Sequence, residues 1–188
     1  MIISTENADV CLRGLCMADA ETLFRLVDQN RPHLRKWLPW LDSSTSVERT
    51  REFIQGTLMR SEAAAGFVCA IHFRESMVGV VGHNSIEQAN RISHVGYWLS
   101  ESHTGRGIMT CAVRALIEHA FSELYLNRID IRVAVGNHRS QAIPDRLSFS
   151  QEGVIRQAEW LYDHFVDLRV NGLLRSDWDR GNAGRADR

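Results

Sequence analysis

The chain has 188 residues, 44% of them hydrophobic, which is enough for the core of one domain of ordinary size. Its 22 basic and 23 acidic side chains give a formal net charge of −1, which argues against a general electrostatic grip on nucleic acid or on an anionic membrane. Lys36 is the only lysine, so reactions that need a lysine nucleophile have almost no candidate.

The cysteine spacing argues against a metal site, and the hydrophobicity pattern argues against a membrane segment. None of the four cysteines belongs to a Cys-x-x-Cys pair or has a histidine at zinc-finger spacing, so we expect small buried thiols and no metal. No apolar run approaches the ~20 residues of a membrane-spanning helix, and the first residues lack the basic segment of a secretory signal. We therefore expect a cytoplasmic protein without a direct nucleic-acid or membrane partner.

The spacing of apolar residues predicts helices and strands in a mixed order. The N-terminal part is expected to form, in chain order, a strand at 8–15, a helix at 18–30, a short aromatic-rich helix or turn at 33–40 and a helix at 47–64. The middle part has the period of strands, at 67–73, 77–86 and 91–99. The C-terminal part is expected to form a helix at 109–124, a strand at 128–135, a short helix at 138–147 and strands around 154–161 and 165–174.

This order of elements predicts one α+β domain over residues 1–180. The three consecutive strands in the middle are joined by segments of hairpin length, so they are expected to form an antiparallel meander. Residues 181–188 are small and polar, and we expect them to form a frayed, disordered tail.

Two glycines one residue apart lie between the last strand of the meander and the helix that follows it. A helix N-terminus leaves several N–H groups unpaired and carries partial positive charge, so Gly105 and Gly107 are suited to hold a phosphate or pyrophosphate. A tight turn without a ligand is the open alternative, because glycine pairs are common in turns. The segment lacks the Lys-Ser/Thr of a Walker loop and the third glycine of a dinucleotide-binding fingerprint.

The order of elements and these residues together resemble the GNAT superfamily of acetyl-CoA-dependent N-acetyltransferases, over nearly the whole chain. The family's pyrophosphate loop, Q/R-x-x-G-x-G/A, falls on residues 104–109, with Thr104 and Met109 as departures. The resemblance implies the GNAT fold, in which a mixed and mostly antiparallel sheet is flanked by helices. It implies acetyl-CoA as cosubstrate, held by Trp98, Leu99, Gly105, Arg106, Gly107, Ile108, Met109, Thr110, Asn137 and Ser140.

A finer resemblance is to the RimL- and RimJ-like branch, which acetylates the N-terminal serine or alanine of ribosomal proteins. Residues 34–41, 105–110, 137–140 and 157–161 carry this resemblance. In such enzymes the Asn of N-x-x-S contacts the CoA arm, its Ser lies near the thioester sulfur, and the Glu of Q-A-E lies where the amine loses its proton. The resemblance also implies a homodimer.

In this chain those roles fall on Asn137, Ser140 and Glu159. Glu159 is then the general base. Many GNAT enzymes use a tyrosine as general acid where this chain has Pro144, so Ser140 is the best remaining donor to the thiolate. Pro144 is also expected to remove the helix hydrogen bond to the Ser140 carbonyl and to bend the helix. Two simpler interpretations stay open: Asn137 as an ordinary helix N-cap and Glu159 as a solvated surface carboxylate.

Three further residues bear on the substrate groove and on the turn after the short helix. Trp37 and Trp40 are interpreted as walls of the substrate groove, with a core or dimer contact as the alternative. A main-chain N–H of residues 97–99 is expected to polarise the thioester carbonyl. Ser148 stands where the family usually has a glycine, so we expect a strained turn there.

Three functions remain open on the sequence. The first is acetyl transfer to the N-terminal amino group of a protein such as a ribosomal component. The second keeps the fold and the cofactor but takes a small amine, for example a polyamine, an aminoglycoside or a peptide toxin. The third is a CoA-binding protein without transfer activity, which the departures at Thr104, Met109 and Ser148 suggest.

Overall fold

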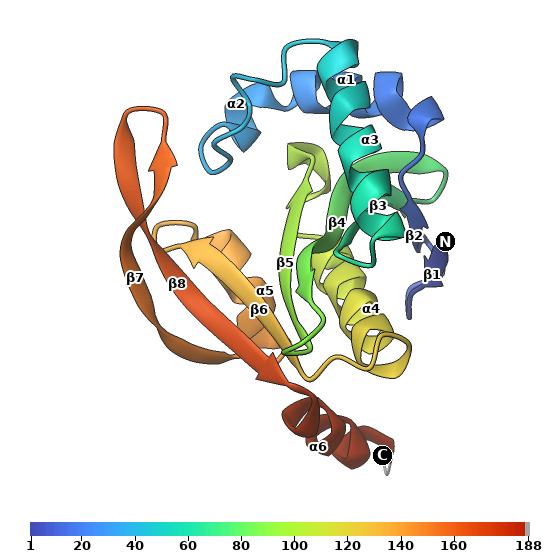
Figure 1. The fold of residues 1–188 in the computed structure, drawn as a ribbon, viewed down its shortest axis with the longest axis vertical. Helices are drawn as coiled ribbons and strands as arrows, with labels where there is room; N and C mark the ends of the chain where they lie inside the picture. The colour runs from blue at the N-terminus through green and yellow to red at the C-terminus, as the bar shows by residue number, and fades with distance from the viewer. Residues whose placement is uncertain (187–188) are drawn as a thin grey trace.

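The central element of the molecule is an eight-stranded sheet in the order β1-β2-β3-β4-β5-β6-β8-β7 (Figure 1). The computed structural model describes the backbone of residues 1–186 and the side chains of residues 1–181. All neighbouring strands in this sheet are antiparallel except β5 and β6, so the predicted mixed and mostly antiparallel sheet is confirmed. The strands are β1 Ile2–Ser4, β2 Val10–Gly14, β3 Phe67–Phe73, β4 Ser76–Glu87, β5 Ile92–Leu99, β6 Arg128–Ala134, β7 Ser150–Leu161 and β8 His164–Leu174.

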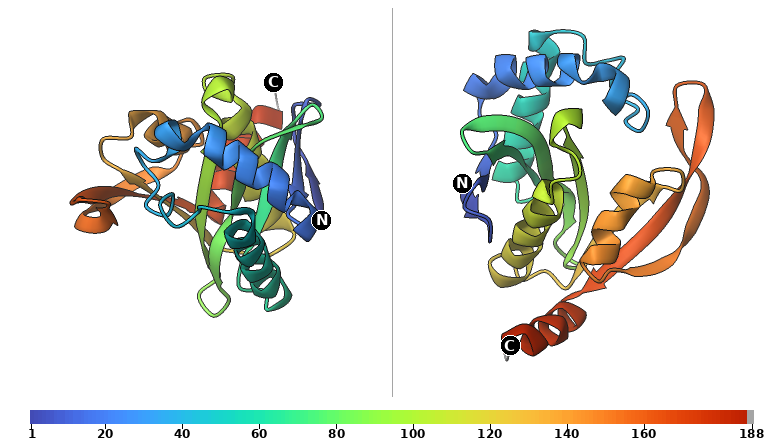
Figure 2. Two further views of the ribbon diagram at one scale, coloured as in Figure 1. Left: turned by 90° about the horizontal axis from the view of Figure 1, so that it is seen from above. Right: turned by 180° about the vertical axis from the view of Figure 1, so that it is seen from behind.

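Helices cover both faces of the sheet, and each face has its own hydrophobic core (Figure 2). Successive side chains of a strand point to opposite faces, so Val80 packs in the core with α1 and α3 while its neighbour Val81 packs in the core with α4. The helices are η1 Met17–Asp19, α1 Ala20–Gln29, α2 Arg31–Leu34, α3 Val47–Glu62, η2 Glu101–His103, α4 Ile108–Ser122, α5 His138–Arg146 and α6 Arg175–Ala186. Among the described residues, none of these helices is long and apolar enough to span a membrane.

The two parallel strands β5 and β6 pair only at one end. Residues 92–94 lie opposite residues 128–130, and beyond that point the strands diverge, as Figure 1 shows. At this end of β6 the Arg128 guanidinium contacts Asp130 of the same strand at 2.6 Å and Glu152 on β7 at 2.9 Å. The divergence leaves residues 95–99 of β5 without a partner on the β6 side, so their main-chain groups are available to a ligand.

The structure differs from the sequence-based expectation at both ends of the chain. Strand β1 was not predicted, because three residues are too few to show a period. Helix α6 was not predicted either, because its residues are mostly polar. Of its described side chains, at positions 175–181, only Trp178 is firmly buried, against Phe121. This helix runs to Ala186 and so enters the segment 181–188 that was expected to fray, while residues 187 and 188 lie outside the described residues.

Candidate functional site

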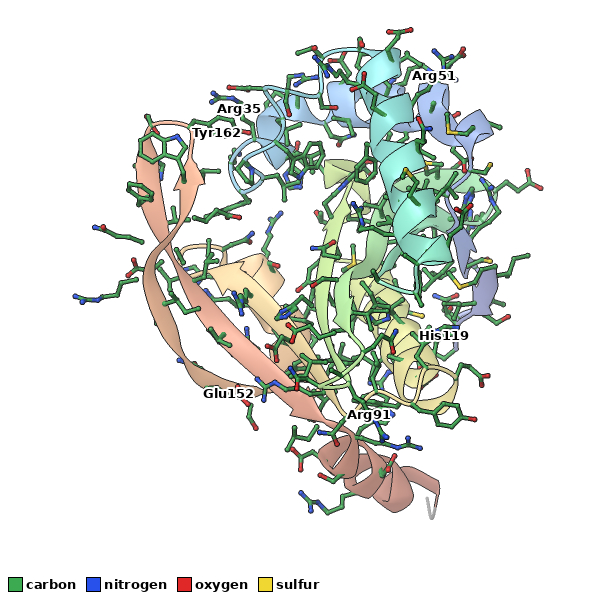
Figure 3. The ribbon with its side chains drawn as sticks, in the orientation of Figure 1. Arg35, Arg51, Arg91, His119, Glu152 and Tyr162 are labelled. Carbon is green, nitrogen blue, oxygen red and sulfur yellow. The ribbon has the colours of Figure 1, made fainter. Side chains whose placement is uncertain are left out.

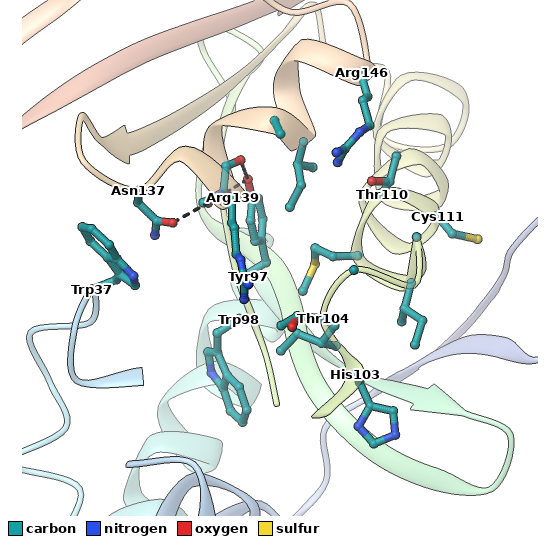
Figure 4. Close-up of a pocket in the computed structure, with 18 of the residues that line it drawn as sticks. Trp37, Tyr97, Trp98, His103, Thr104, Thr110, Cys111, Asn137, Arg139 and Arg146 are labelled. Carbon is teal, nitrogen blue, oxygen red and sulfur yellow. Dashed lines mark hydrogen bonds between the residues drawn. The ribbon is translucent and has the colours of Figure 1, made fainter. Parts of the chain in front are cut away.

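A cleft of about 930 Å³ opens where β5 and β6 diverge (Figure 4). Its walls come from β5, from the loop before α4 and the first turn of α4, from α5, and from α2 with the segment after it. All of the residues predicted to hold the cofactor line this cleft except Arg106: Trp98, Leu99, Gly105, Gly107, Ile108, Met109, Thr110, Asn137 and Ser140.

The glycine loop has the geometry of an anion cradle. Gly105 and Gly107 adopt left-handed backbone conformations, with φ of 76° and 75°, and a Cβ at either position would meet nothing within 4 Å. In the described part of the chain, no N–H group from residue 105 to residue 110 donates to a protein acceptor. The N-terminus of the 15-residue helix α4 therefore presents unpaired donors to open space.

The two departures from the family loop pattern have structural explanations. Thr104 donates from Oγ1 to the carbonyl of Glu101 at 2.8 Å, so its side chain shapes the turn. Met109 is buried in the core with α4 and also lines the cleft, so its larger side chain is accommodated. Neither residue blocks the cradle.

Two arginines of α5 were missed by the sequence analysis. Arg139 and Arg146 both line the cleft (Figure 4). They are seven residues apart, which places them on one face of a helix, and this spacing could have identified them. Their fixed positive charges suit further phosphate groups.

Asn137, Ser140 and Tyr97 form a compact hydrogen-bonded group in the same cleft (Figure 4). Asn137 Oδ1 accepts from the main-chain N–H of Ser140 at 3.2 Å, so the N-cap interpretation is confirmed. The Ser140 carbonyl accepts from Tyr97 Oη at 3.1 Å, and the Ser140 hydroxyl donates to the same oxygen at 3.3 Å. Sequence reasoning did not assign Tyr97 this role.

The turn after α5 confirms a further expectation. Ser148, which stands where the family usually has glycine, adopts a left-handed conformation with φ of 63°. A non-glycine residue in this region carries a strain of roughly 1–2 kcal/mol.

Glu159 lies on β7, and a bulge sets its direction. Ile155 pairs with Leu168 and Glu159 with Val166, so residues 156–158 oppose a single residue of β8. Within the bulge Gln157 has φ of 49°, and its N–H donates to Asp167 Oδ1 at 2.8 Å. Glu159 is half-buried, and burial raises the pKa of its carboxyl. Its side chain lines neither the cleft nor the second cavity, so the structure does not place it against Ser140.

A second cavity of about 980 Å³ lies on the other side of β5, between the sheet and helices α1 and α3. Trp40 lines it, with its ring centroid 6.5 Å from that of Trp98, whereas Trp37 lines the first cleft. The two predicted groove residues are therefore divided between the cavities. Leu38, Tyr97 and Trp98 line both cavities and form the wall between them.

The tip of the β7–β8 hairpin is joined to the segment after α2 (Figure 3). Tyr162 donates its hydroxyl hydrogen bond to the carbonyl of Leu38. The Arg35 guanidinium lies 3.7 Å from the centre of the Tyr162 ring and pairs with Asp42 at 2.8 Å. This contact between two segments far apart in the sequence fixes the segment that carries the wall residue Leu38.

Within the residues that the structure describes, no group of three or more histidine, cysteine, aspartate or glutamate side chains could hold a metal ion.

Comparison with known proteins gives consistent matches. The sequence pattern of the family described as "Acetyltransferase (GNAT) domain" matches residues 9–150. The chain is 36% identical over 174 residues to "Putative ribosomal N-acetyltransferase YdaF" of Bacillus subtilis (strain 168), which covers 92% of this chain and 95% of that protein. It is 34% identical over 159 residues to ribosomal-protein-serine acetyltransferase of Escherichia coli (strain K12), with coverage of 85% and 89%.

A solved structure of RimL, a ribosomal alpha-N-protein acetyltransferase in complex with coenzyme A, matches with a TM-score of 0.91 at 31% identity. The match covers 95% of this chain and 100% of that chain.

Proposed function

The chain belongs to the GNAT acetyltransferase family, and from this premise we propose that it transfers the acetyl group of acetyl-CoA to the N-terminal amino group of a protein such as a ribosomal protein. The observation that carries the proposal is a single cleft that joins the open N–H groups of residues 105–110 to the Ser140 hydroxyl. This arrangement suits a ligand with a diphosphate at one place and a reactive thioester at another. The relatives named as ribosomal-protein acetyltransferases support the choice of acceptor.

The cleft residues fit acetyl-CoA by their chemistry. The main-chain N–H groups of residues 105–110 would hold the diphosphate, and Arg139 and Arg146 would pair with further phosphate charge. The unpaired edge of β5 at residues 95–99 would bind the amide-rich arm and polarise the thioester carbonyl. Asn137 faces the same cleft but its side-chain oxygen is already used as the N-cap of α5, which leaves its amide N–H groups for the arm.

The reaction needs a neutral amine and a stabilised thiolate. An α-amino group has a pKa of about 7.7–8.0, so a weak base is enough to remove its proton near neutral pH. General-base catalysis of this kind raises the rate by roughly 10²–10⁴-fold. The amine attacks the thioester carbonyl carbon, Glu159 takes a proton from its nitrogen, and the carbon–sulfur bond breaks. The Ser140 hydroxyl donates its proton to the departing thiolate and regains one from solvent, so that CoA leaves as the thiol.

The second cavity supports an acceptor that approaches from the opposite side of β5. The wall formed by Leu38, Tyr97 and Trp98 is shared with the cleft, so an amine in the second cavity would reach the thioester beside these residues. Glu159 would then act on the amine from β7, directly or through a water molecule, once the acceptor is bound. A small amine is the second candidate acceptor, because a cavity of about 980 Å³ is also the size of a small-molecule site.

Release of free thiol from acetyl-CoA tests the proposal. The acceptors are short peptides with a free N-terminal serine or alanine, the same peptides with a blocked N-terminus, and a polyamine. We expect turnover with the free peptides alone. Turnover with the polyamine alone would favour the small-amine function, and CoA binding without turnover on any acceptor would favour a binding protein.

A cytoplasmic location and a homodimer belong to the same proposal. Ribosomal proteins and acetyl-CoA meet in the cytoplasm. The β7–β8 hairpin exposes apolar side chains that support contact with a second copy: Val154, Ile155, Trp160 and Phe165. Light scattering coupled to size-exclusion chromatography should give the mass of a dimer, and the mass of a monomer at micromolar concentration would exclude one.

A further inference from the structure

Tyr97 and Ser140 form a closed ring of hydrogen bonds beside the wall between the two cavities. The Ser140 hydroxyl donates to Tyr97 Oη at 3.3 Å, and Tyr97 Oη donates to the Ser140 carbonyl at 3.1 Å. A phenol has one proton, and Tyr97 donates it to the Ser140 carbonyl. The lone pairs of the phenol oxygen therefore remain to accept the hydrogen bond from the serine hydroxyl. Each bond therefore fixes the direction of the other.

The Ser140 carbonyl is available because its own helix cannot satisfy it. In an α-helix this carbonyl would accept from the main-chain N–H of residue 144, but Pro144 has no N–H group. A partly buried carbonyl without a partner is costly. Tyr97 on β5 supplies the missing donor from a position 43 residues away in the sequence.

We infer that Tyr97 is a positioning residue for acetyl transfer: its hydroxyl replaces the N–H group that Pro144 lacks and keeps Ser140 Oγ in place, and the Ser140 hydroxyl turns its proton from Tyr97 Oη to the sulfur as the thiolate departs. The inference rests on the proposed function, since it takes Ser140 as the donor to the departing thiolate. Tyr97 acts through Ser140, and it neither gives nor takes a proton in the reaction.

Two further observations support this role. Burial raises the pKa of Tyr97 to about 12, so its hydroxyl stays protonated and can donate at every working pH. Within the described residues, the Ser140 hydroxyl has no hydrogen-bond partner other than Tyr97. If that partner is lost, the hydroxyl is free to rotate.

The first test measures the contact through thermal unfolding, without reference to activity. Tyr97→Phe leaves the Ser140 carbonyl without a donor, and we expect the Tm to fall by roughly 3–6 °C. Pro144→Ala restores the helix N–H group. In that background Tyr97→Phe should lower the Tm by less than half as much. Tyr125→Phe is the matched control, because Tyr125 is 66% exposed and its substitution should leave the Tm unchanged. An equal Tm loss from Tyr97→Phe in both backgrounds would overturn the inference.

The second test separates positioning from simple support of the fold. Tyr97→Phe should lower kcat about tenfold, with the KM for acetyl-CoA unchanged, because Ser140 Oγ loses the contact that keeps it in place but the cofactor contacts remain. Pro144→Ala should restore the Tm of Tyr97→Phe but not its kcat, since a main-chain N–H cannot accept from the Ser140 hydroxyl. In a Ser140→Ala background Tyr97→Phe should have almost no further effect on kcat.

Independent, multiplicative losses of kcat from Tyr97→Phe and Ser140→Ala would contradict the inference, and so would recovery of kcat in the Tyr97→Phe, Pro144→Ala double variant. If the unsubstituted protein turns over no acceptor, the proposed function fails. The unfolding experiment then still decides whether Tyr97 replaces the missing N–H group, so the two failures can be told apart.

Discussion

The imidazole of His83 lies 2.6 Å from the hydroxyl of Ser93, between Nδ1 and Oγ, in the fully buried contact of β4 with β5. The edge of the His83 ring packs against Phe67, with 4.9 Å between ring centroids. Burial lowers the pKa of His83 to about 3. Strands β4 and β5 are thus held together around a neutral histidine.

This pairing predicts a loss of stability in acid. Between pH 6.5 and 3 the unfolded chain binds a proton at residue 83 and the folded chain does not, so the free energy of unfolding falls as the pH falls. The slope from this one group is at most about 1.4 kcal/mol per pH unit. Chemical denaturation between pH 7 and 4 gives the free energy of unfolding as a function of pH. This free energy should fall less steeply with falling pH in His83→Gln, whatever the stability of the variant at pH 7. His164→Gln, on an exposed side chain, should keep the original slope. An unchanged slope in His83→Gln would show that another group causes the acid sensitivity.

Glu159→Gln should slow acetyl transfer by roughly 10²–10⁴-fold when the pH is below the pKa of the acceptor amine. The loss should shrink above about pH 8, where the amine is already neutral. In the unsubstituted protein, kcat should fall on the acid side as the carboxylate becomes protonated. Because burial raises the pKa of Glu159, this fall should begin at a higher pH than an ordinary glutamate would give. Affinity for CoA should stay the same.

Glu75→Gln, in the exposed β3–β4 turn, is the control. Equal pH–rate profiles for the unsubstituted protein, Glu159→Gln and Glu75→Gln would remove Glu159 from the mechanism.

Ser148→Gly should stabilise the protein. The left-handed conformation at this position costs serine roughly 1–2 kcal/mol and costs glycine little, although glycine also loses more entropy on folding. We expect a net gain of about 1 kcal/mol, seen as a Tm increase of roughly 2–4 °C. Ser150→Gly, at the start of β7, gains nothing of this kind and should lower the Tm. A lower Tm for Ser148→Gly would mean that the turn is not strained.

Gly107→Ala tests the anion cradle. The new Cβ meets no protein atom, but it stands in the open space before the N–H groups and strains a backbone with φ of 75°. Titration calorimetry should show CoA binding at least about tenfold weaker, a loss of about 1.4 kcal/mol. Gly153→Ala is the matched control. A Cβ at Gly153 also has no atom within 4 Å, but the backbone there is not in the left-handed region. Equal affinities for the two variants would show that the loop does not hold the phosphates.

Much of the fold could be predicted from the sequence, because it is encoded in local patterns. The three strands of the meander and the helix after the glycines repeat their apolar residues over seven or more positions, and the structure confirms them. Strand β1 and helix α6 could not be predicted, since one is too short and the other too polar to show a period.

The candidate site shows the same limit in finer detail. A local rule predicted that Pro144 would leave the Ser140 carbonyl without its helix partner. The identity of the replacement, Tyr97, depends on how β5 and α5 pack, which no local pattern encodes. The direction of Glu159 depends on the bulge at residues 156–158, and the sequence alone does not show which residues of a strand are left out of the pairing.

The most direct measurement is the mass and the acetylation site of a peptide acceptor after incubation with the protein and acetyl-CoA. The peptide carries a free N-terminal serine and one internal lysine, so that two amines compete. Our account predicts one added acetyl group, located on the N-terminal nitrogen by fragmentation in the mass spectrometer, and almost none with Glu159→Gln. An acetyl group on the lysine, or an unmodified peptide beside a protein that binds CoA, would contradict it.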